Sequence, residues 1–281
     1  MPELPEVETI CRLLRQGSNN HPTLTGMRIR SADLLWERTL AEPTPLEFQH
    51  RLPGQQILDI NRRGKFLVFR LTDDHLILHL RMSGDLVIEP QEAPIPAHHR
   101  LILYLQGEPL RLAFNDTRKF GRVWLTAHPN QVLGRLGPEP LEPSFTADHL
   151  YQRLQRTRRQ IKPLLLDQSF LAGLGNIYTD EALHLAKIHP LTPANLINPE
   201  RAEQLWSAIR HVLQEGIRRN GASIDWVYRG GDFQNYFRVY QRTGQPCPEC
   251  GALIERTLVG QRGTHCCPVC QSLPALNLRK E

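Results

Sequence analysis

Four cysteines close to the C-terminal end place the strongest constraint on how this chain folds. They form two C-x2-C pairs, Cys247 with Cys250 and Cys267 with Cys270, and 16 residues separate the pairs. Two such pairs can present four thiolates tetrahedrally to Zn²⁺, and four protein ligands leave no open position for a catalytic water. We therefore predict one structural zinc ion, which in so small a module supplies much of the folding free energy.

The neighbouring thiol and imidazole groups have simpler interpretations. Cys266 would break the second pair if it replaced Cys267, so we expect it to be a strand residue. Cys11 is expected in the core on a helix face, and His265 at the surface or bonded to the backbone. Zinc-dependent hydrolysis is not supported, because the cysteines saturate the metal and no H-E-x-x-H motif is present.

The opening segment and the hydropathy of the chain bear on its compartment. The first residues are acidic and lack an apolar stretch of signal-peptide length, and no later window approaches the roughly 20 apolar residues of a membrane span. Without a secretory signal, paired cysteines favour a metal site over disulfides. We expect a cytoplasmic protein, and nothing in the sequence indicates more than a monomer.

Basic residues are concentrated in the second half of the chain. Residues 150–281 carry 17 Lys and Arg against 11 Asp and Glu, a balance of +6, whereas residues 1–149 carry 17 against 18, a balance of −1. These balances sum to the formal net charge of +5. The excess permits a polyanionic partner and places the anion-binding surface mainly in the second half.

Hydrophobic periodicity changes along the chain and predicts both helices and strands. Apolar residues from Val7 to Leu14 follow helical spacing after Pro5, which predicts an N-terminal helix ending near Gly17. Residues 56–126 contain short apolar runs separated by turn signals, which is typical of a β-sandwich or barrel-like domain. Further helices are expected over residues 148–158, 162–168, 176–186 and 199–220.

Two short segments of the basic half could bind a phosphate. Gly173 and Gly175 let backbone N–H groups approach an anion, and Asn176 is placed to cap the following helix. An ordinary helix connection explains these three residues at least as well. Arg262 lies between the cysteine pairs, where a small hairpin could hold it against a phosphate or leave it solvated.

The start of the chain, Met-Pro-Glu, allows nucleophilic chemistry. If Met1 is removed, Pro2 presents a secondary amine, and α-amino groups have pKa values of about 8, against about 10.4 for lysine. Such an amine can attack a sugar C1′ and form an iminium linkage, while Glu3 moves protons to and from the opening sugar ring. Glu6 falls in the first helical turn, where the helix dipole stabilises a carboxylate. Alone, this start is weak evidence, because many chain ends are merely frayed.

Ten sequence blocks, in order from Pro2 to Gln271, carry a resemblance to a known family. They are MPELPEVET, RRGKFLVF, HLRMSG, FNDTRKFGR, LGPEPL, IKPLLLDQ, FLAGLGNIYTDEAL, QNYFRVY, RTGQPCPECG and GTHCCPVCQ. Together they resemble the formamidopyrimidine-DNA glycosylases, also called 8-oxoguanine-DNA glycosylases, of base-excision repair. So many blocks in one order are far more specific than any single block.

The resemblance implies a bifunctional DNA glycosylase and AP lyase. Such an enzyme excises oxidised purines, 8-oxoguanine and formamidopyrimidines, from damaged double-stranded DNA through a Schiff base and cleaves the strand by β,δ-elimination. It implies an α+β multidomain fold, with zinc as the one cofactor and no membrane partner. The expected parts are an N-terminal β-sandwich catalytic domain with an N-terminal helix (1–132), a linker (133–147), a helix–two-turn–helix DNA-binding domain (148–235), a C-terminal zinc finger (236–271) and a tail (272–281).

Matched residue by residue, the resemblance implies a set of catalytic groups. Pro2 corresponds to the Schiff-base nucleophile and Glu3 to the proton donor. Lys65 falls at the lysine that assists β-elimination and contacts phosphate, and Arg262 at the finger arginine linked to δ-elimination. The metal ligands are the four paired cysteines.

The resemblance also implies DNA-binding residues. Asn176 corresponds to an asparagine that holds phosphate at the lesion, and Lys162 to a lysine of the lesion site. Met82, Arg118 and Phe120 match the trio that fills the gap left by a flipped nucleotide, where inserted side chains offset the cost of unstacking. From the residues alone, Met82 and Phe120 would be interpreted as core residues.

Two further DNA contacts align less firmly. The run Ala97-His98-His99-Arg100 stands where the family often has Lys-His-x-His, so His98 is the candidate and its alignment can shift by one. Three arginines, at 156, 158 and 159, take the place of a family lysine, and Arg158 is our candidate among them. The loop over residues 221–235, near the expected damaged-base pocket, receives no residue assignments.

Two alternative functions remain open from the sequence. An endonuclease VIII-like glycosylase prefers oxidised pyrimidines, and that branch usually differs at the gap-filling trio. A non-catalytic zinc-finger DNA-binding protein would use the same basic second half but has no need of a free amine at Pro2.

Overall fold

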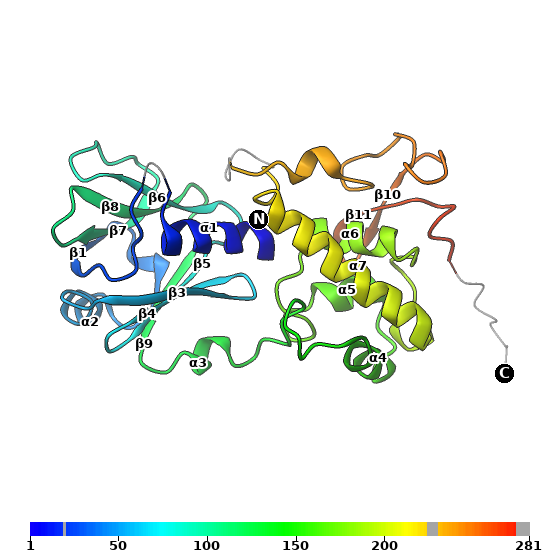
Figure 1. The fold of residues 1–281 in the computed structure, drawn as a ribbon, viewed down its shortest axis with the longest axis horizontal. Helices are drawn as coiled ribbons and strands as arrows, with labels where there is room; N and C mark the ends of the chain where they lie inside the picture. Colours follow the sequence, from blue (N-terminus) through cyan, green and yellow to red (C-terminus); the bar gives the residue numbers. More distant parts are fainter. Residues whose placement is uncertain (19–20, 224–229, 274–281) are drawn as a thin grey trace. The chain divides into compact units, whose positions relative to one another are not determined.

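A computed structural model describes residues 1–18, 21–223 and 230–273. It divides into two compact units (Figure 1). Unit 1 comprises Met1–Arg135 with Asn220–Gly231, and unit 2 comprises Leu136–Arg219 with Asp232–Glu281. Most of the expected tail, and residues 224–229 of the expected base-pocket loop, lie outside the described residues.

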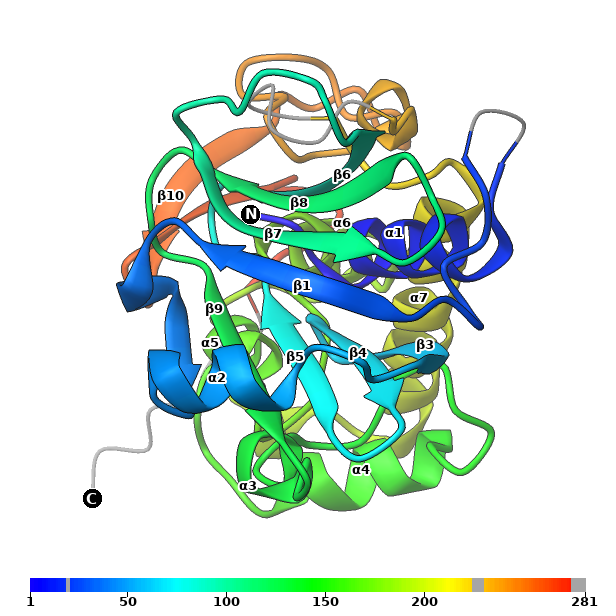
Figure 2. The ribbon, with the colours of Figure 1, turned by 90° about the vertical axis from the view of Figure 1, so that its left-hand side faces the viewer.

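Unit 1 contains two β-sheets and a helix docked beside them (Figure 2). One sheet has the strand order β1-β7-β8-β6, and the other has the order β2-β9-β5-β4-β3. The elements are α1 (Leu4–Gln16), β1 (Ile29–Leu34), η1 (Glu37–Thr39), β2 (Leu40–Glu42), α2 (Pro45–Arg51), β3 (Ile57–Arg63), β4 (Phe66–Leu71), β5 (His75–His79), β6 (Gly84–Pro90), β7 (His99–Leu105), β8 (Leu110–Asp116), β9 (Arg122–Thr126) and α3 (Asn130–Leu133).

A continuous apolar core joins the two sheets of unit 1. Phe69 and Leu78 come from one sheet and Leu103 and Phe114 from the other, and all four are buried in the same cluster. This arrangement is a β-sandwich, as the alternating apolar runs predict. The sequence pattern did not predict β1, β2 and α2, because β1 has only one fully buried residue and the other two elements are very short.

The N-terminal helix follows its predicted course. Pro5 lies in the first turn, and the apolar residues from Val7 to Leu14 face the core. The helix ends before Gly17, whose φ of 74° continues the chain out of helical geometry. α1 packs against β3 and β4 of the same unit.

Unit 2 is helical and ends in a small hairpin. The long helix α7 packs against α4 and α6, with the predicted apolar face inward, and α6 packs against α5 and β11. None of the helices in the described part of the chain is long and apolar enough to cross a membrane. The elements are α4 (Ala147–Gln155), α5 (Ile161–Leu166), α6 (Asn176–Leu185), η2 (Ala194–Leu196), α7 (Pro199–Arg218), η3 (Phe233–Tyr236), β10 (Glu255–Val259) and β11 (Arg262–Cys266).

Candidate active site and metal centre

The start of α1 is held in place by one buried carboxylate. Glu6 accepts a hydrogen bond from the backbone N–H of Glu3 at 2.8 Å and another from the N–H of Ala222 at 2.7 Å. Pro2, Glu3 and Glu6 are all buried. Glu6 therefore does more than complement the helix dipole, because it fixes the backbone next to Pro2.

A series of contacts between α1 and β3 leads toward Lys65. The Cys11 thiol donates to the carbonyl of Asn61 at 3.0 Å, and one turn earlier in the helix Glu8 accepts from Arg62 Nε at 3.1 Å. The contacts thus move toward the start of α1 as β3 proceeds. Lys65 lies just beyond, in the two-residue turn between β3 and β4, and it is buried. The fold therefore brings the turn of Lys65 toward the end of the helix where the chain begins.

Glu8 is an ionised part of this series. Burial raises the pKa of Glu8, but hydrogen bonds and charge from Arg12 and Arg62 outweigh that effect and hold the pKa below its ordinary value. Arg12 lies one helical turn after Glu8, with 2.8 Å between Nε and Oε1. The carboxylate therefore stays charged at neutral pH and keeps α1 fixed along β3.

The three residues predicted to fill the gap left by a flipped nucleotide lie on two exposed loops of unit 1. Met82 belongs to the loop between β5 and β6, and Arg118 and Phe120 belong to the loop between β8 and β9. Met82 is 36% exposed and Phe120 49% exposed, so the interpretation as core residues is wrong. The Arg118 guanidinium lies over the Phe120 ring, 5.0 Å from its centroid. Side chains so placed are available to DNA.

A buried histidine fixes the loop that carries Met82. His79 Nδ1 accepts a hydrogen bond from the backbone N–H of Arg81 at 3.0 Å. Burial, with the nearby charges of Arg81 and Lys65, lowers the pKa of His79 to about 3. The ring is therefore neutral, which leaves Nδ1 able to accept.

The two adjacent histidines at the start of β7 differ in their surroundings. His98 is exposed, whereas His99 is buried with its Nε2 2.9 Å from Glu89 Oε1. Of the two positions that the alignment allows, only His98 presents its side chain to solvent. Its contact with DNA stays a prediction.

In unit 2, two predicted site residues meet at one carbonyl of the finger. Lys162 Nζ and Asn176 Nδ2 both donate to the carbonyl oxygen of Gly263, at 3.0 and 2.9 Å. Lys162 also pairs with Asp180 at 2.6 Å, and both side chains of that pair are fully buried. The clamped carbonyl directly follows Arg262, which is exposed. Lys162 therefore supports the backbone beside Arg262, and a direct contact of Lys162 with DNA stays a prediction.

Asn176 does not cap α6. The N-cap residue is Gly175, and Asn176 is the first residue of the helix. Its side chain points instead to the finger hairpin, because Gly263 offers an acceptor there. The glycine turn also differs from expectation, since the N–H of Gly173 donates to Gln168 Oε1 at 2.9 Å rather than being free for an anion.

Two of the three arginines after α4, Arg158 and Arg159, differ in whether their side chains form an ion pair. Arg159 Nη1 lies 2.7 Å from Asp167 Oδ2. Within the described ranges Arg158 is exposed and has no hydrogen-bond or ion-pair partner. Arg158 therefore remains the candidate for a DNA contact, and the contact stays a prediction.

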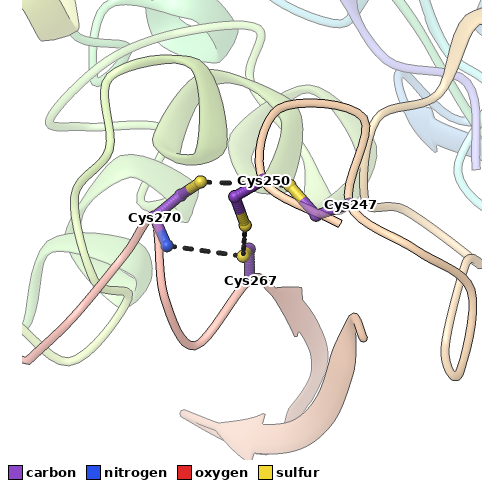
Figure 3. Close-up of side chains that lie close together, drawn as sticks. All are labelled: Cys247, Cys250, Cys267 and Cys270. Atoms are coloured by element: carbon purple, nitrogen blue, oxygen red, sulfur yellow. Dashed lines mark hydrogen bonds between the residues drawn. The ribbon is translucent and has the colours of Figure 1, made fainter. Parts of the chain in front are cut away.

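The four paired cysteines converge on one point (Figure 3). Their Sγ atoms all lie within 4.8 Å of one another, with 3.9 Å between Cys247 and Cys270 and 3.4 Å between Cys250 and Cys267. In a tetrahedral site with Zn–S bonds of about 2.3 Å, neighbouring sulfurs are about 3.8 Å apart. The donor set therefore fits a single zinc ion. Cys266 is the last residue of β11, as expected, and is not among the four.

Three buried residues of α6 that the sequence did not single out hold this finger to the helical part of unit 2. Asp180 accepts from the backbone N–H of His265 at 3.0 Å, so His265 is bonded rather than at the surface. Glu181 accepts three backbone N–H bonds from residues 238–240, and burial raises the pKa of its carboxyl group. His184 Nε2 lies 3.3 Å from Cys247 Sγ. The only sequence cue was the presence of charged residues on a helix that is otherwise buried.

Comparison with known families now identifies the chain. Residues 1–123 match the formamidopyrimidine-DNA glycosylase N-terminal domain, residues 136–227 match the H2TH domain of the same enzymes, and residues 244–273 match the zinc finger found in FPG and IleRS. A formamidopyrimidine-DNA glycosylase of Protochlamydia amoebophila is 43% identical over 96% of this chain and 99% of its own length. The chain belongs to the formamidopyrimidine-DNA glycosylase family.

Other members of the formamidopyrimidine-DNA glycosylase family agree closely. The Chloroflexus aurantiacus enzyme is 47% identical over 96% of this chain and 98% of its own length. Among solved structures, Lactococcus lactis FPG bound to Fapy-dG-containing DNA is 37% identical, with a TM-score of 0.88 over 96% of this chain and 100% of that chain. MutM bound to DNA containing carbocyclic 8-oxo-G is 38% identical, with a TM-score of 0.88 over 97% of this chain and 100% of that chain.

These findings confirm the predicted family, the multidomain α+β fold and the enzyme class of DNA glycosylase and AP lyase. The predicted cofactor, one structural zinc ion held by the four paired cysteines, is confirmed as well. The individual catalytic and DNA-binding residues are not tested by these comparisons and stay predictions.

Proposed function

We propose that this chain excises oxidised purines from duplex DNA by nucleophilic attack of Pro2 and then nicks the strand. The observation that carries the proposal is the start of α1. There Glu6 fixes the backbone beside Pro2 and Glu3, and the contacts along β3 lead to the turn of Lys65. Damaged double-stranded DNA is the partner that such a site requires.

The first step forms one bond and breaks another. The unprotonated nitrogen of Pro2 attacks C1′ of the flipped nucleotide, and the N-glycosidic bond breaks; the base leaves with the bonding electrons and takes up the proton that the secondary amine loses. Glu3, the next residue, gives a proton to the ring oxygen as the sugar opens, which leaves an iminium between Pro2 and C1′. A terminal amine with a pKa of about 8 keeps a useful unprotonated fraction at neutral pH.

The strand is then cut by two eliminations. Loss of a C2′ proton expels the 3′-phosphate, and Lys65 is the proposed contact to that phosphate. A second elimination expels the 5′-phosphate, and Arg262 of the finger is the proposed residue that holds it with two hydrogen bonds. Asn176 and Lys162 support this arginine through the Gly263 carbonyl. The zinc ion has no part in these steps beyond holding the finger hairpin.

Extraction of the base precedes this chemistry. Flipping a nucleotide costs a few kcal/mol, which inserted apolar and cationic side chains offset. Met82, Phe120 and Arg118 are exposed on the loops of unit 1 and are suited to that insertion. His98 and Arg158, also exposed, are proposed contacts to the DNA backbone.

We also propose how the parts are divided and where the enzyme acts. The proposed catalytic residues Pro2, Glu3 and Lys65 belong to the sandwich part of the chain, and Arg158, Asn176 and Arg262 belong to the helical part and finger. The enzyme works as a monomer in the cytoplasm, associated with the nucleoid through DNA. The expected DNA substrate and the sequence support these proposals.

Oxidised pyrimidines are a second candidate substrate class. One Lactococcus lactis FPG structure, 37% identical with a TM-score of 0.88 over 97% of this chain and 100% of that chain, has DNA with an oxidised pyrimidine bound. The gap-filling trio favours purines, so we expect purine lesions to be excised faster. Single-turnover excision from two duplexes that differ only in the lesion compares the two classes.

Borohydride trapping tests the proposed mechanism. The protein is mixed with duplex DNA containing 8-oxoguanine opposite cytosine and reduced. We expect a covalent adduct with the wild-type protein and none with Pro2→Gly, while both proteins bind a duplex that carries an uncleavable abasic-site analogue. Binding without an adduct in the wild type would instead support a non-catalytic DNA-binding protein.

A further inference from the structure

A buried carboxylate lies beneath the two exposed loops of unit 1. We call residues 80–84 the Met82 loop and residues 117–121 the Arg118 loop. Asp116, the last residue of β8, is 0% exposed and lies opposite Gly84 at the start of β6. In the part of the chain that the structure describes, Asp116 has no ion-pair partner. Its buried side-chain oxygens therefore depend on hydrogen bonds from neighbouring residues.

The side-chain hydrogen bonds of Asp116 go to both loops. The Ser83 hydroxyl of the Met82 loop donates to Asp116 Oδ1. In the Arg118 loop, the backbone N–H of Arg118 donates to Asp116 Oδ1 at 3.2 Å, and the N–H of Gly121 donates to Oδ2 at 2.7 Å. Ser83 completes the connection, because its oxygen also accepts from the N–H of Arg118 at 3.0 Å.

An aromatic ring provides an independent link between the same loops. The Phe114 ring, fully buried, lies against a glycine of each loop. A Cβ at Gly84 would lie 2.8 Å from Phe114 Cε2, and a Cβ at Gly121 would lie 2.2 Å from Phe114 Cζ. Both distances are too short for a side chain, so both loops must close on this ring through glycine.

We infer that Ser83 and Asp116 are positioning residues that hold the Met82 loop and the Arg118 loop at a fixed spacing. The three exposed side chains of these loops then enter DNA as one rigid unit. Neither Ser83 nor Asp116 is itself available to DNA, because both are buried. The inference rests on the proposed function, in which those side chains offset the cost of base flipping.

The inference is tested by comparing two duplexes under single-turnover conditions. One carries 8-oxoguanine opposite cytosine, and the other carries a preformed abasic site, which has no damaged base to extrude. For Ser83→Ala we expect excision of 8-oxoguanine to fall about tenfold, while cleavage at the abasic site stays within about twofold of wild type. Asp116→Asn, which keeps the shape but loses an acceptor, should show the same split.

Two controls separate positioning from general destabilisation. Thr44→Ala removes a hydroxyl that caps α2 in the same unit through Glu47, and should leave both activities unchanged. Ser83→Thr keeps the hydroxyl and should restore excision.

A fluorescent cytosine analogue opposite the lesion reports insertion directly, and its signal change should be slower in Ser83→Ala.

Three results would overturn the inference. Equal losses on both duplexes would mean that Ser83 acts only through stability. Wild-type excision in both Ser83→Ala and Asp116→Asn would mean that the loops do not need the link. A wild-type protein that cleaves neither duplex would refute the proposed function itself, and with it this role.

Discussion

Unit 1 and the finger of unit 2 are stabilised internally by different kinds of interaction. Unit 1 surrounds one large apolar cluster between two sheets, where each fully buried large side chain contributes about 1.5–3 kcal/mol. The finger of unit 2 has only a small cluster, built from Val239, Cys247, Ile254 and Cys267. It is held instead by thiolates around a metal and by buried carboxylates of α6.

This difference predicts which substitutions should affect the stability and activity of each unit. In unit 1 the proposed chemistry of Pro2 depends on local polar groups such as Glu6, which fixes the adjacent backbone. The finger hairpin that carries Arg262 keeps its conformation only while the metal is bound and the Lys162–Asp180 pair is intact. Removal of zinc or loss of the buried Lys162–Asp180 pair should therefore act on unit 2, and changes to buried polar groups such as His79 should act on unit 1.

Removal of zinc should give the largest difference between the units. Zinc binding contributes about 10 kcal/mol or more to the folding of small zinc modules. We expect a strong chelator, or Cys250→Ser, to unfold the finger and abolish DNA binding while the sandwich of unit 1 keeps its thermal transition. Zinc release and calorimetry measure the two effects. If removal of zinc instead unfolded both units in one cooperative transition, the two units would not be stabilised independently.

The buried pair between Lys162 and Asp180 should have the next largest effect. Lys162→Met leaves the Asp180 carboxylate unpaired in a dry site, which costs about 3–5 kcal/mol. It also frees the Gly263 carbonyl beside Arg262, so δ-elimination should fall relative to β-elimination. Urea unfolding and the ratio of cleavage products measure these effects.

The matched control is Arg159→Met, which breaks the exposed pair with Asp167. Because Arg159 is 50% exposed, we expect a change of only about 0–1 kcal/mol and an unaltered product ratio. Equal effects of the two substitutions would show that the buried pair has no special role.

Acid should act on unit 1 through His79. Burial lowers the pKa of His79 to about 3, against an ordinary value of about 6.5, so the unfolded chain binds a proton first. The neutral ring's contribution to stability is therefore complete above pH 6.5 and is lost as the pH falls toward 3. Between pH 7.5 and pH 5 we expect wild type to lose about 2 kcal/mol more than His79→Gln, measured by urea unfolding. Identical pH profiles would contradict the buried neutral state.

The smallest effect is expected from a single exposed arginine of unit 2. Arg158→Ala should lower the salt dependence of DNA binding by about one unit of slope, if Arg158 neutralises one phosphate. Arg158→Lys keeps the charge and should keep the slope. A slope that does not change in Arg158→Ala would remove Arg158 from the DNA-binding surface.

The sequence predicted those parts of the molecule that depend on local pattern. The first helix, the strands after Gln56 and the zinc ligands all follow from spacing along the chain. Where the pattern is short or weak, as in β1, the prediction failed. Only the family resemblance indicated that Met82 and Phe120 are exposed, because the sequence pattern alone assigns isolated apolar residues to the core.

The polar links could not be predicted from the sequence, because they join residues far apart in the chain. The sequence predicted that Asn176 caps a helix, but in the structure its side chain donates a hydrogen bond to the Gly263 carbonyl. Glu6 looked like a dipole-stabilising residue, and its bond to Ala222 is formed only when the fold brings the two together. Asp116 gave no signal at all, since its role arises from the meeting of two loops.

The most direct test of the account is to locate the covalent bond in the trapped complex. The protein is reduced on 8-oxoguanine duplex, digested with a protease and a nuclease, and sequenced by mass spectrometry. We predict a sugar remnant on the nitrogen of Pro2, in a peptide from which Met1 is absent. A remnant on Lys65, or an active protein whose Pro2 nitrogen still carries methionine or an acetyl group, would contradict it.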